Sequence, residues 1–119
     1  MKKVLVVDDD KGICEMLTMI LEYCGYEVEC LCTADKVFEK LSSYKADVLL
    51  MDIMIAGLDG REICHEIKIN TQTSKLPVLL MSATHFPSLS TSSEDAPDGF
   101  FEKPFDMDLL LKEIDRLAA

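Results

Sequence analysis

Positively charged residues are scarce in this sequence. Its 119 residues include 12 Lys and Arg against 22 Asp and Glu, which gives a formal net charge of −10 with both histidines neutral. Non-specific contacts with nucleic acid and with anionic membranes depend on Lys and Arg, so we expect neither as a direct partner of this domain. Long hydrophobic runs are also missing. The first apolar run, Val4 to Val7, ends at three aspartates and is too short for a secretory or membrane segment.

Paired cysteines are the second absence. There is no CxxC pair and no histidine at zinc-ligand spacing among the five cysteines, which are Cys14, Cys24, Cys30, Cys32 and Cys64. We therefore expect reduced, mostly buried thiols in a cytoplasmic protein, and a core role is favoured over a redox role. Cys30 and Cys32 would share one face of a strand, where near-neighbours are poorly placed to bridge each other.

Apolar content is high enough for a folded domain. With 49% apolar and 29% charged residues, the chain can bury a core, and its length favours one domain over residues 1–119. Short apolar or alternating runs predict five β-strands, at residues 4–7, 27–32, 48–51, 78–81 and 100–101. Each gap has room for one helix. We therefore predict an α/β fold, a three-layer sandwich in which helices cover both faces of a parallel sheet.

Helical periodicity fills most of the gaps between the strands. Residues that can cap helices precede the periodic stretches: Asp10 before the first, Thr33 before the second, Asp59 near the start of the third and Asp106 before the last. Residues 84–98 differ, because they are rich in serine, contain two prolines and show no sustained apolar face. We predict a shortened or irregular fourth helix there.

Polar residues follow the apolar runs where each predicted strand ends. Asp8, Asp9 and Asp10 follow the first strand, Asp52 the third, Ser82 the fourth and Lys103 the fifth. Taken singly, the triplet is a solvated capping run, Ser82 a strand-end hydroxyl and Lys103 a surface lysine. In an open parallel sheet, however, the ligand site lies beyond the carboxyl ends of the strands. We therefore expect these side chains to converge on one edge.

The clustered carboxylates predict a divalent cation, because they repel one another unless a cation lies among them. A small, open set of oxygen ligands suits Mg²⁺ or Mn²⁺, whereas Ca²⁺ is disfavoured without an EF-hand-like loop. A carboxylate beside such a cation, with a lysine and a hydroxyl nearby, is suited to accept a phosphoryl group. Asp52 would attack in line and become an acyl phosphate.

Four segments resemble the receiver domain of two-component response regulators and together span essentially the whole chain. They are KVLVVDDD at the first strand, DVLLMDIMIAGLDG at the third, LPVLLMSAT at the fourth and FFEKPF at the fifth. The resemblance implies a doubly wound, flavodoxin-like sheet with strand order 2-1-3-4-5. It also implies phosphorylation at Asp52, and it gives the Mg²⁺ ligands as Asp8, Asp9, Asp52 and the backbone carbonyl of Met54. Ser82 and Lys103 would contact the phosphoryl group, and the Lys103–Pro104 bond would be cis.

The same resemblance implies a switch that works with protein partners. The phosphodonor would be a phosphohistidine on a sensor histidine kinase or a phosphotransfer protein, and the output would pass to an effector domain or downstream protein. The chain would catalyse its own phosphorylation and slow dephosphorylation, as a self-modifying switch more than a turnover enzyme. Ser82 and Phe100 would reorient together, and Phe100 would act sterically because it lacks the hydroxyl of the tyrosine found in many relatives.

Two departures from the family pattern keep an alternative open. Ala56 stands where proline is usual, and the serine-rich residues 84–98 replace an amphipathic helix. They lend some weight to a receiver fold that acts as a phosphorylation-independent interaction module. Against this alternative, the chain retains all five chemical positions: Asp8, Asp9, Asp52, Ser82 and Lys103.

Two other phosphate-related classes are minor alternatives. A haloacid-dehalogenase-type phosphatase expects Thr or Val where Gly12 stands, and it needs a cap domain for which there is no room. In a flavodoxin-like FMN binder, three aspartates after the first strand would repel the phosphate.

Overall fold

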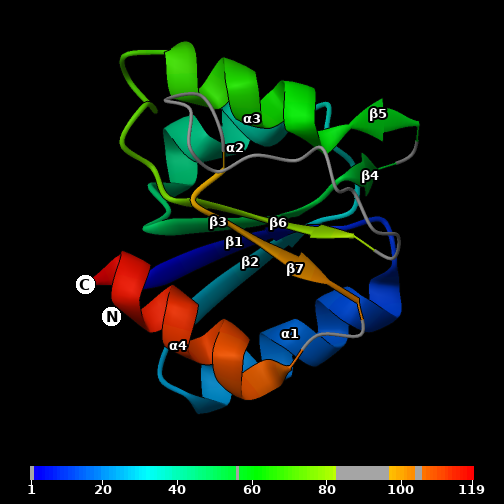
Figure 1. Cartoon of the computed structure of the whole chain (residues 1–119), viewed down its shortest axis with the longest axis vertical. Coiled ribbons are helices and arrows are strands. Elements are labelled where there is room, and N and C mark those ends of the chain that lie inside the picture. The colour runs from blue at the N-terminus through cyan, green and yellow to red at the C-terminus, as the bar shows by residue number, and fades with distance from the viewer. Residues whose placement is uncertain (1, 56, 83–96, 104–105) are drawn as a thin grey trace.

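The computed structural model describes residues 2–55, 57–82, 97–103 and 106–119. Their central feature is a five-stranded sheet made of β1 (Lys3–Val7), β2 (Glu27–Leu31), β3 (Val48–Asp52), β6 (Val78–Ser82) and β7 (Gly99–Glu102). The order is β2-β1-β3-β6-β7, and every neighbouring pair is parallel (Figure 1). The predicted doubly wound strand order is confirmed.

The three central strands are the most apolar part of the chain. Every residue of β3 and β6 is buried, as are four of the five residues of β1. Such continuous burial is expected of parallel strands that are covered by helices on both faces. The edge strand β2 is only partly buried and begins with the exposed Glu27.

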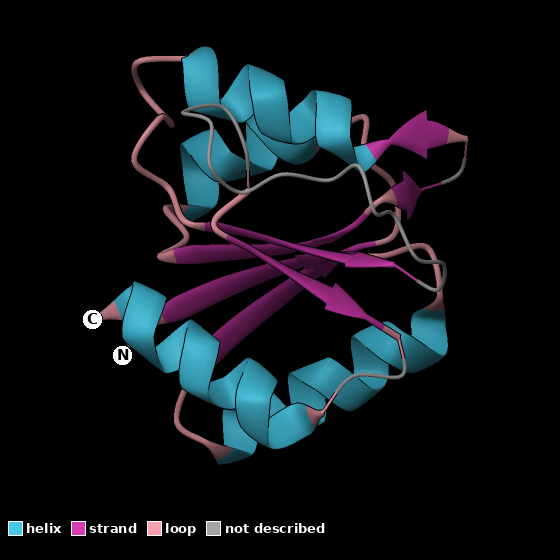
Figure 2. Cartoon of the chain, in the orientation of Figure 1, coloured by secondary structure: helices cyan, strands magenta, loops and turns pink. Residues whose placement is uncertain are grey.

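Four helices cover the sheet within the described part of the chain: α1 (Lys11–Tyr23), α2 (Val37–Tyr44), α3 (Gly60–Ile69) and α4 (Met107–Ala118). Figure 2 shows α1 and α4 on one face and α2 and α3 on the other. Successive side chains of a strand point to opposite faces. Val4 and Val6 accordingly pack with α1 and α4, whereas Leu5 and Val7 pack with α2 and α3. The predicted three layers are confirmed. None of these helices has the length and apolar character needed to cross a membrane.

Aspartate side chains cap three of the helices, as predicted. Asp10 accepts hydrogen bonds from the backbone N–H groups of Gly12 and Ile13, at 2.9 and 3.3 Å. Asp59 and Asp106 cap α3 and α4 in the same way. These bonds satisfy backbone donors that the first helical turn leaves without a partner.

The predicted cap of the second helix is wrong. α2 begins at Val37, four residues beyond Thr33, and its N-cap residue Lys36 makes no side-chain capping bond. A turn comes first, in which the Val37 N–H donates to the Ala34 carbonyl at 3.3 Å. Ala34 is buried in the core, so these residues carry the chain from β2 onto the sheet before the helix starts.

A short antiparallel hairpin between β3 and α3 was not predicted. It pairs β4 (Met54–Ile55) with β5 (Leu58–Asp59). Ile55 is fully buried, whereas Met54 and Leu58 are 54% and 47% exposed. The hairpin leads the chain from the end of β3 directly to the Asp59 cap of α3.

The cysteine prediction is only partly confirmed. All five thiols are free, with Cys14 and Cys64 buried and Cys30 partly buried. Cys24 and Cys32 are exposed, because each follows the last residue of an element, α1 in one case and β2 in the other.

Three sequence predictions fall outside the described residues. They are the irregular helix within residues 83–96, the effect of Ala56 on its loop and the cis bond between Lys103 and Pro104.

Candidate functional site

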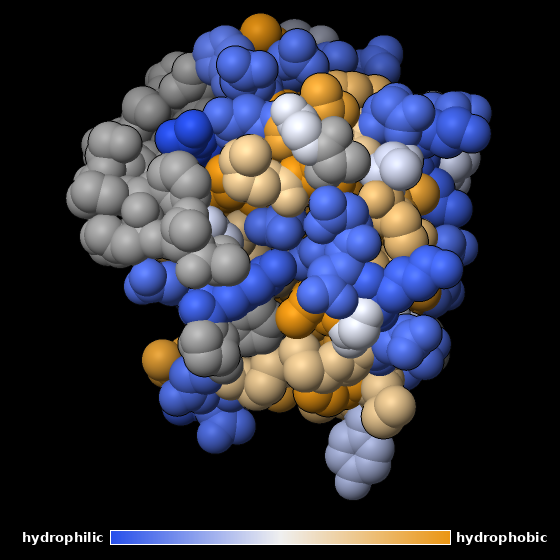
Figure 3. Space-filling model, turned by 90° about the vertical axis from the view of Figure 1, so that its right-hand side faces the viewer, coloured by the Kyte–Doolittle hydropathy of each residue, from blue (hydrophilic) through white to orange (hydrophobic). Residues whose placement is uncertain are grey.

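Three carboxylates meet at the carboxyl ends of β1 and β3. Asp8 and Asp9 follow β1, and Asp52 is the last residue of β3. The two strands pair in register, with Val7 opposite Met51, so Asp8 and Asp52 lie at neighbouring positions. One oxygen of each carboxylate lies within 4.8 Å of the others. Figure 3 faces this edge of the molecule, where hydrophilic side chains gather between apolar ones. The predicted convergence of the three aspartates is confirmed.

Asp8 is completely buried and is held through both its side chain and its backbone. One carboxylate oxygen accepts from the Asp10 N–H at 2.9 Å, and the other accepts from the Lys103 ammonium at 2.8 Å. Its backbone N–H donates to the Leu31 carbonyl at 3.0 Å. Its carbonyl accepts from the Cys14 thiol at 3.2 Å. The adjacent strand and helix therefore fix this carboxylate in place.

Lys103 joins the two buried carboxylates. Its Nζ lies 2.8 Å from Asp8 Oδ2 and 3.3 Å from Asp52 Oδ2, and its side chain is 15% exposed. Burial lowers the pKa of Lys103, but the hydrogen bond to Asp8 and the two negative charges outweigh it, so the pKa lies above its usual value. Lys103 is therefore a fixed positive charge at neutral pH.

For Asp52, the effects that raise the pKa outweigh those that lower it, which disfavours the charged form. Burial raises its pKa, and the nearby charge of Asp8 raises it further. The charge and hydrogen bond of Lys103, together with a hydrogen bond from the Met54 backbone N–H, lower the pKa but offset only part of the increase. Ionising Asp52 therefore costs more in the folded chain than in a solvent-exposed aspartate, and a further positive charge beside it would reduce that cost.

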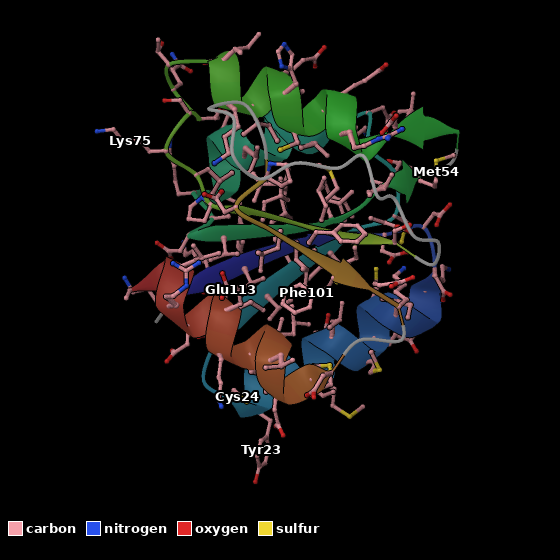
Figure 4. All side chains as sticks on the ribbon, in the orientation of Figure 1. Tyr23, Cys24, Met54, Lys75, Phe101 and Glu113 are labelled. Carbon is pink, nitrogen blue, oxygen red and sulfur yellow. The ribbon has the colours of Figure 1, made fainter. Side chains whose placement is uncertain are left out.

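The other candidate residues lie around this centre. Ser82 is the last residue of β6 and is 2% exposed, and its carbonyl accepts from the Lys103 backbone N–H at 2.6 Å. Met54 lies on β4 at the same edge of the sheet (Figure 4). Phe100 lies one strand further out, opposite Leu80, and packs against the core on the α2 and α3 side.

Gly60 is a neighbour of Asp52 whose importance is not evident from the sequence. Its N–H donates to the Ile53 carbonyl at 2.5 Å. A Cβ atom added at Gly60 would overlap the backbone carbonyl oxygen of Asp52 and lie 3.0 Å from the Ile53 Cα. The sequence places Asp59 near the start of a helix, but it does not show which backbone passes close to the glycine that follows.

Cys14 contacts the backbone of Asp8, and the sequence did not predict this contact with the site. Burial raises the pKa of its thiol to about 12, and the nearby Cys30, Cys32 and Asp8 contribute to the increase. Cys14 therefore keeps its proton at neutral pH and donates it to the Asp8 carbonyl.

The fold and the site together define a class. A parallel sheet in this order, with carboxylates at the carboxyl ends of β1 and β3 and a lysine directly after β7, is the architecture of a receiver domain. The sequence matches the response regulator receiver domain family over residues 4–115, and the chain belongs to that family.

Individual relatives agree with this assignment. The chain is 34% identical over 110 residues to the response regulator MprA of Mycobacterium ulcerans, an alignment covering 92% of this chain and 47% of the relative. The chain thus spans about half the length of the curated relatives it matches.

Two solved structures show the same fold. The receiver domain of a DNA-binding response regulator from Colwellia psychrerythraea has a TM-score of 0.89 and 29% identity, covering 98% of both chains. The chemotaxis response regulator CheY4 of Vibrio cholerae has a TM-score of 0.84 and 28% identity, also covering 98% of both chains.

Proposed function

We propose that this chain is a phosphorylation-controlled switch that accepts a phosphoryl group on Asp52. One observation carries the proposal. A nearly buried carboxylate at a strand end lies 3.3 Å from a lysine ammonium and beside two further carboxylates. A purely structural role would not favour this arrangement, because clustered buried carboxylates disfavour one another's ionised form.

The donor set fits a hard divalent cation, Mg²⁺ or Mn²⁺. Three carboxylate oxygens lie within 4.8 Å of one another, and the Lys103 ammonium contacts two of these carboxylates, those of Asp8 and Asp52. Asp9 is exposed and Asp8 is buried. That combination suits an ion that keeps part of its water shell. We assign Asp8, Asp9, Asp52 and the backbone carbonyl of Met54 to hold it. When bound, the cation would neutralise negative charge on the carboxylates and the transferred phosphoryl group.

The chain's own residues would perform the transfer. An Asp52 carboxylate oxygen attacks the phosphorus of a phosphohistidine, the O–P bond forms, and the P–N bond breaks with its electron pair returning to the imidazole. The Met54 N–H orients the attacking carboxylate. Lys103, held by Asp8, lies beside the acceptor and offsets the charge that arrives with the phosphoryl group.

Ser82 and Phe100 would pass the change to the surface. Ser82 ends β6, and its carbonyl is bonded to the Lys103 N–H, so β6 and the residue after β7 move together. Phe100 lies on β7 and packs against the α2 and α3 side of the core. A phosphoryl group that draws Ser82 inward would shift the population of Phe100 rotamers by a steric route.

The partners follow from the family and are part of the proposal. The phosphodonor is a sensor histidine kinase or phosphotransfer protein, and an effector domain or downstream protein reads the output. We propose that residues 1–119 form one receiver domain and that it works in the cytoplasm.

Intact mass spectrometry tests the proposed function. The protein is incubated with Mg²⁺ and a small acyl phosphate, with EDTA and Asp52→Asn as controls. We expect a gain of one phosphate that disappears in both controls. Absence of any gain in the wild-type protein would refute the switch and favour the phosphorylation-independent interaction module.

A further inference from the structure

Two cysteines meet where α1 packs against β2. Cys14 on α1 is 5% exposed, and Cys30 on β2 is partly buried. The Cys30 sulfur lies 3.0 Å from the Thr18 hydroxyl oxygen and 3.7 Å from the Cys14 carbonyl oxygen. Cys30 therefore points into the turn of α1 that carries Cys14.

The thiol pair is linked to the acidic cluster through the backbone of Asp8. The Cys14 thiol donates to the Asp8 carbonyl at 3.2 Å. The Asp8 N–H donates to the carbonyl of Leu31, the residue that follows Cys30. Both backbone groups of Asp8 are therefore bonded to the segments that carry the two thiols.

We propose that Cys14 and Cys30 are a peroxide-oxidisable pair that closes into an intramolecular disulfide joining α1 to β2. The first step takes place at the more accessible sulfur, where Cys30–SH and a peroxide ROOH give Cys30–SOH and ROH. The Cys14 sulfur then attacks the Cys30 sulfur as its proton passes to the departing hydroxyl group, so that the S–S bond forms, the S–O bond breaks, and water leaves. In total, two thiols lose two electrons and two protons, and the peroxide is reduced to an alcohol and water, or to two waters when it is hydrogen peroxide.

The other cysteines are poorly placed to compete. Cys32 is exposed but is separated from Cys30 by one residue at the end of the same strand, a spacing that does not favour a disulfide. Cys64 is buried in the core on the opposite face of the sheet. Cys24 lies past the end of α1, ten residues beyond Cys14. The pairing is thus set by the packing of α1 on β2.

Oxidation would have a consequence at the acidic cluster. The disulfide removes the hydrogen that Cys14 donates to the Asp8 carbonyl, which leaves a buried acceptor without its thiol donor. Asp8 would then shift, and we expect a several-fold weaker affinity for Mn²⁺. This consequence rests on the proposed cation site, whereas the disulfide itself does not.

Peptide mapping of the whole chain tests the pairing. The protein is treated with hydrogen peroxide, its remaining thiols are alkylated, and it is digested without reductant. We expect a peptide linking Cys14 to Cys30 that dithiothreitol removes. The link should be lost in Cys14→Ser and Cys30→Ser and retained in Cys32→Ser. No link in the wild-type protein, or a link through Cys32, would overturn the proposal. The wild-type map decides the matter even if a variant folds poorly.

Mn²⁺ titration of the reduced and oxidised Cys32→Ser protein tests the consequence separately. Weaker binding to the oxidised form supports the link to Asp8, and equal binding to both forms refutes it. If the reduced form does not bind Mn²⁺, the proposed cation site fails, while the peptide map still decides the pairing.

Discussion

Replacing Lys103 with methionine removes a positive charge that contacts both buried carboxylates, Asp8 and Asp52. The ammonium lies 2.8 Å from Asp8 Oδ2 and 3.3 Å from Asp52 Oδ2, and Asp8 has no exposed surface. Removing one partner of a buried ion pair costs about 3–5 kcal/mol. Because the Lys103 side chain is 15% exposed, we expect the lower end of that range. A loss of about 3 kcal/mol corresponds to roughly 12 °C in melting temperature for a domain of this size.

The same variant gives a signature that ordinary destabilisation would not. Without the ammonium, a divalent cation no longer competes with Lys103 for the carboxylates, so Mg²⁺ should raise the melting temperature of Lys103→Met more than that of the wild type. Lys68→Met is the matched control. Its Nζ is also largely buried and bonds to Asp98 Oδ2 at 2.7 Å, away from the acidic cluster. It should be destabilised but should show only the wild-type response to Mg²⁺.

Urea denaturation measures the loss of stability, and thermal denaturation with and without Mg²⁺ measures the response to the cation. If Lys103→Met lowered the free energy of unfolding by less than about 1 kcal/mol, the two carboxylates would not depend on this ion pair, and the cost of about 3 kcal/mol expected for breaking a buried pair would be refuted. An Mg²⁺ response equal to that of the wild type would refute the idea that lysine and cation share the same carboxylates.

Three further substitutions test separate features of the molecule. Because the folded chain raises the pKa of Asp52, Asp52→Asn should be more stable than the wild type in metal-free buffer at neutral pH. This advantage should disappear as the pH falls below about 4, where Asp52 is protonated in the folded and the unfolded chain, and urea midpoints measured across pH will show it. Gly60→Ala should lower the free energy of unfolding by about 1–3 kcal/mol, because the added methyl group overlaps the Asp52 carbonyl. The control Gly12→Ala, whose Cβ meets only Asp10 Oδ1 at 3.2 Å, should be neutral or stabilising in the same urea assay. Asp106→Ala should cost about 1 kcal/mol through the lost cap of α4, and an unchanged urea midpoint would contradict the capping argument.

Sequence patterns were sufficient for the sheet and for the gathering of the aspartates. Continuous apolar runs identify buried parallel strands, and the carboxyl ends of such strands share one edge, so the order of residues alone places Asp8 and Asp52 together. The N-caps Asp10, Asp59 and Asp106 were predicted correctly because each is a short polar residue directly before an amphipathic stretch. These features depend on local patterns and on one topological rule.

Features that depend on distances between distant segments could not be predicted. The hairpin of β4 and β5 has two residues in each strand, too few for an alternating pattern. Thr33 was a reasonable cap by residue type, but Ala34 is needed in the core before α2 can begin. Likewise, the sequence placed Lys103 at the correct edge without showing that its ammonium contacts both Asp8 and Asp52.

Locating the phosphoryl group on the chain is the decisive test of the proposed role of Asp52. Protein treated with Mg²⁺ and a small acyl phosphate is reduced with borohydride, which converts an aspartyl phosphate to homoserine, and is then mapped by peptide mass spectrometry. We expect homoserine at position 52 in the wild-type protein. Homoserine at position 8 or 9 instead, or at none of the three, would contradict the assignment of Asp52 as the phosphoacceptor.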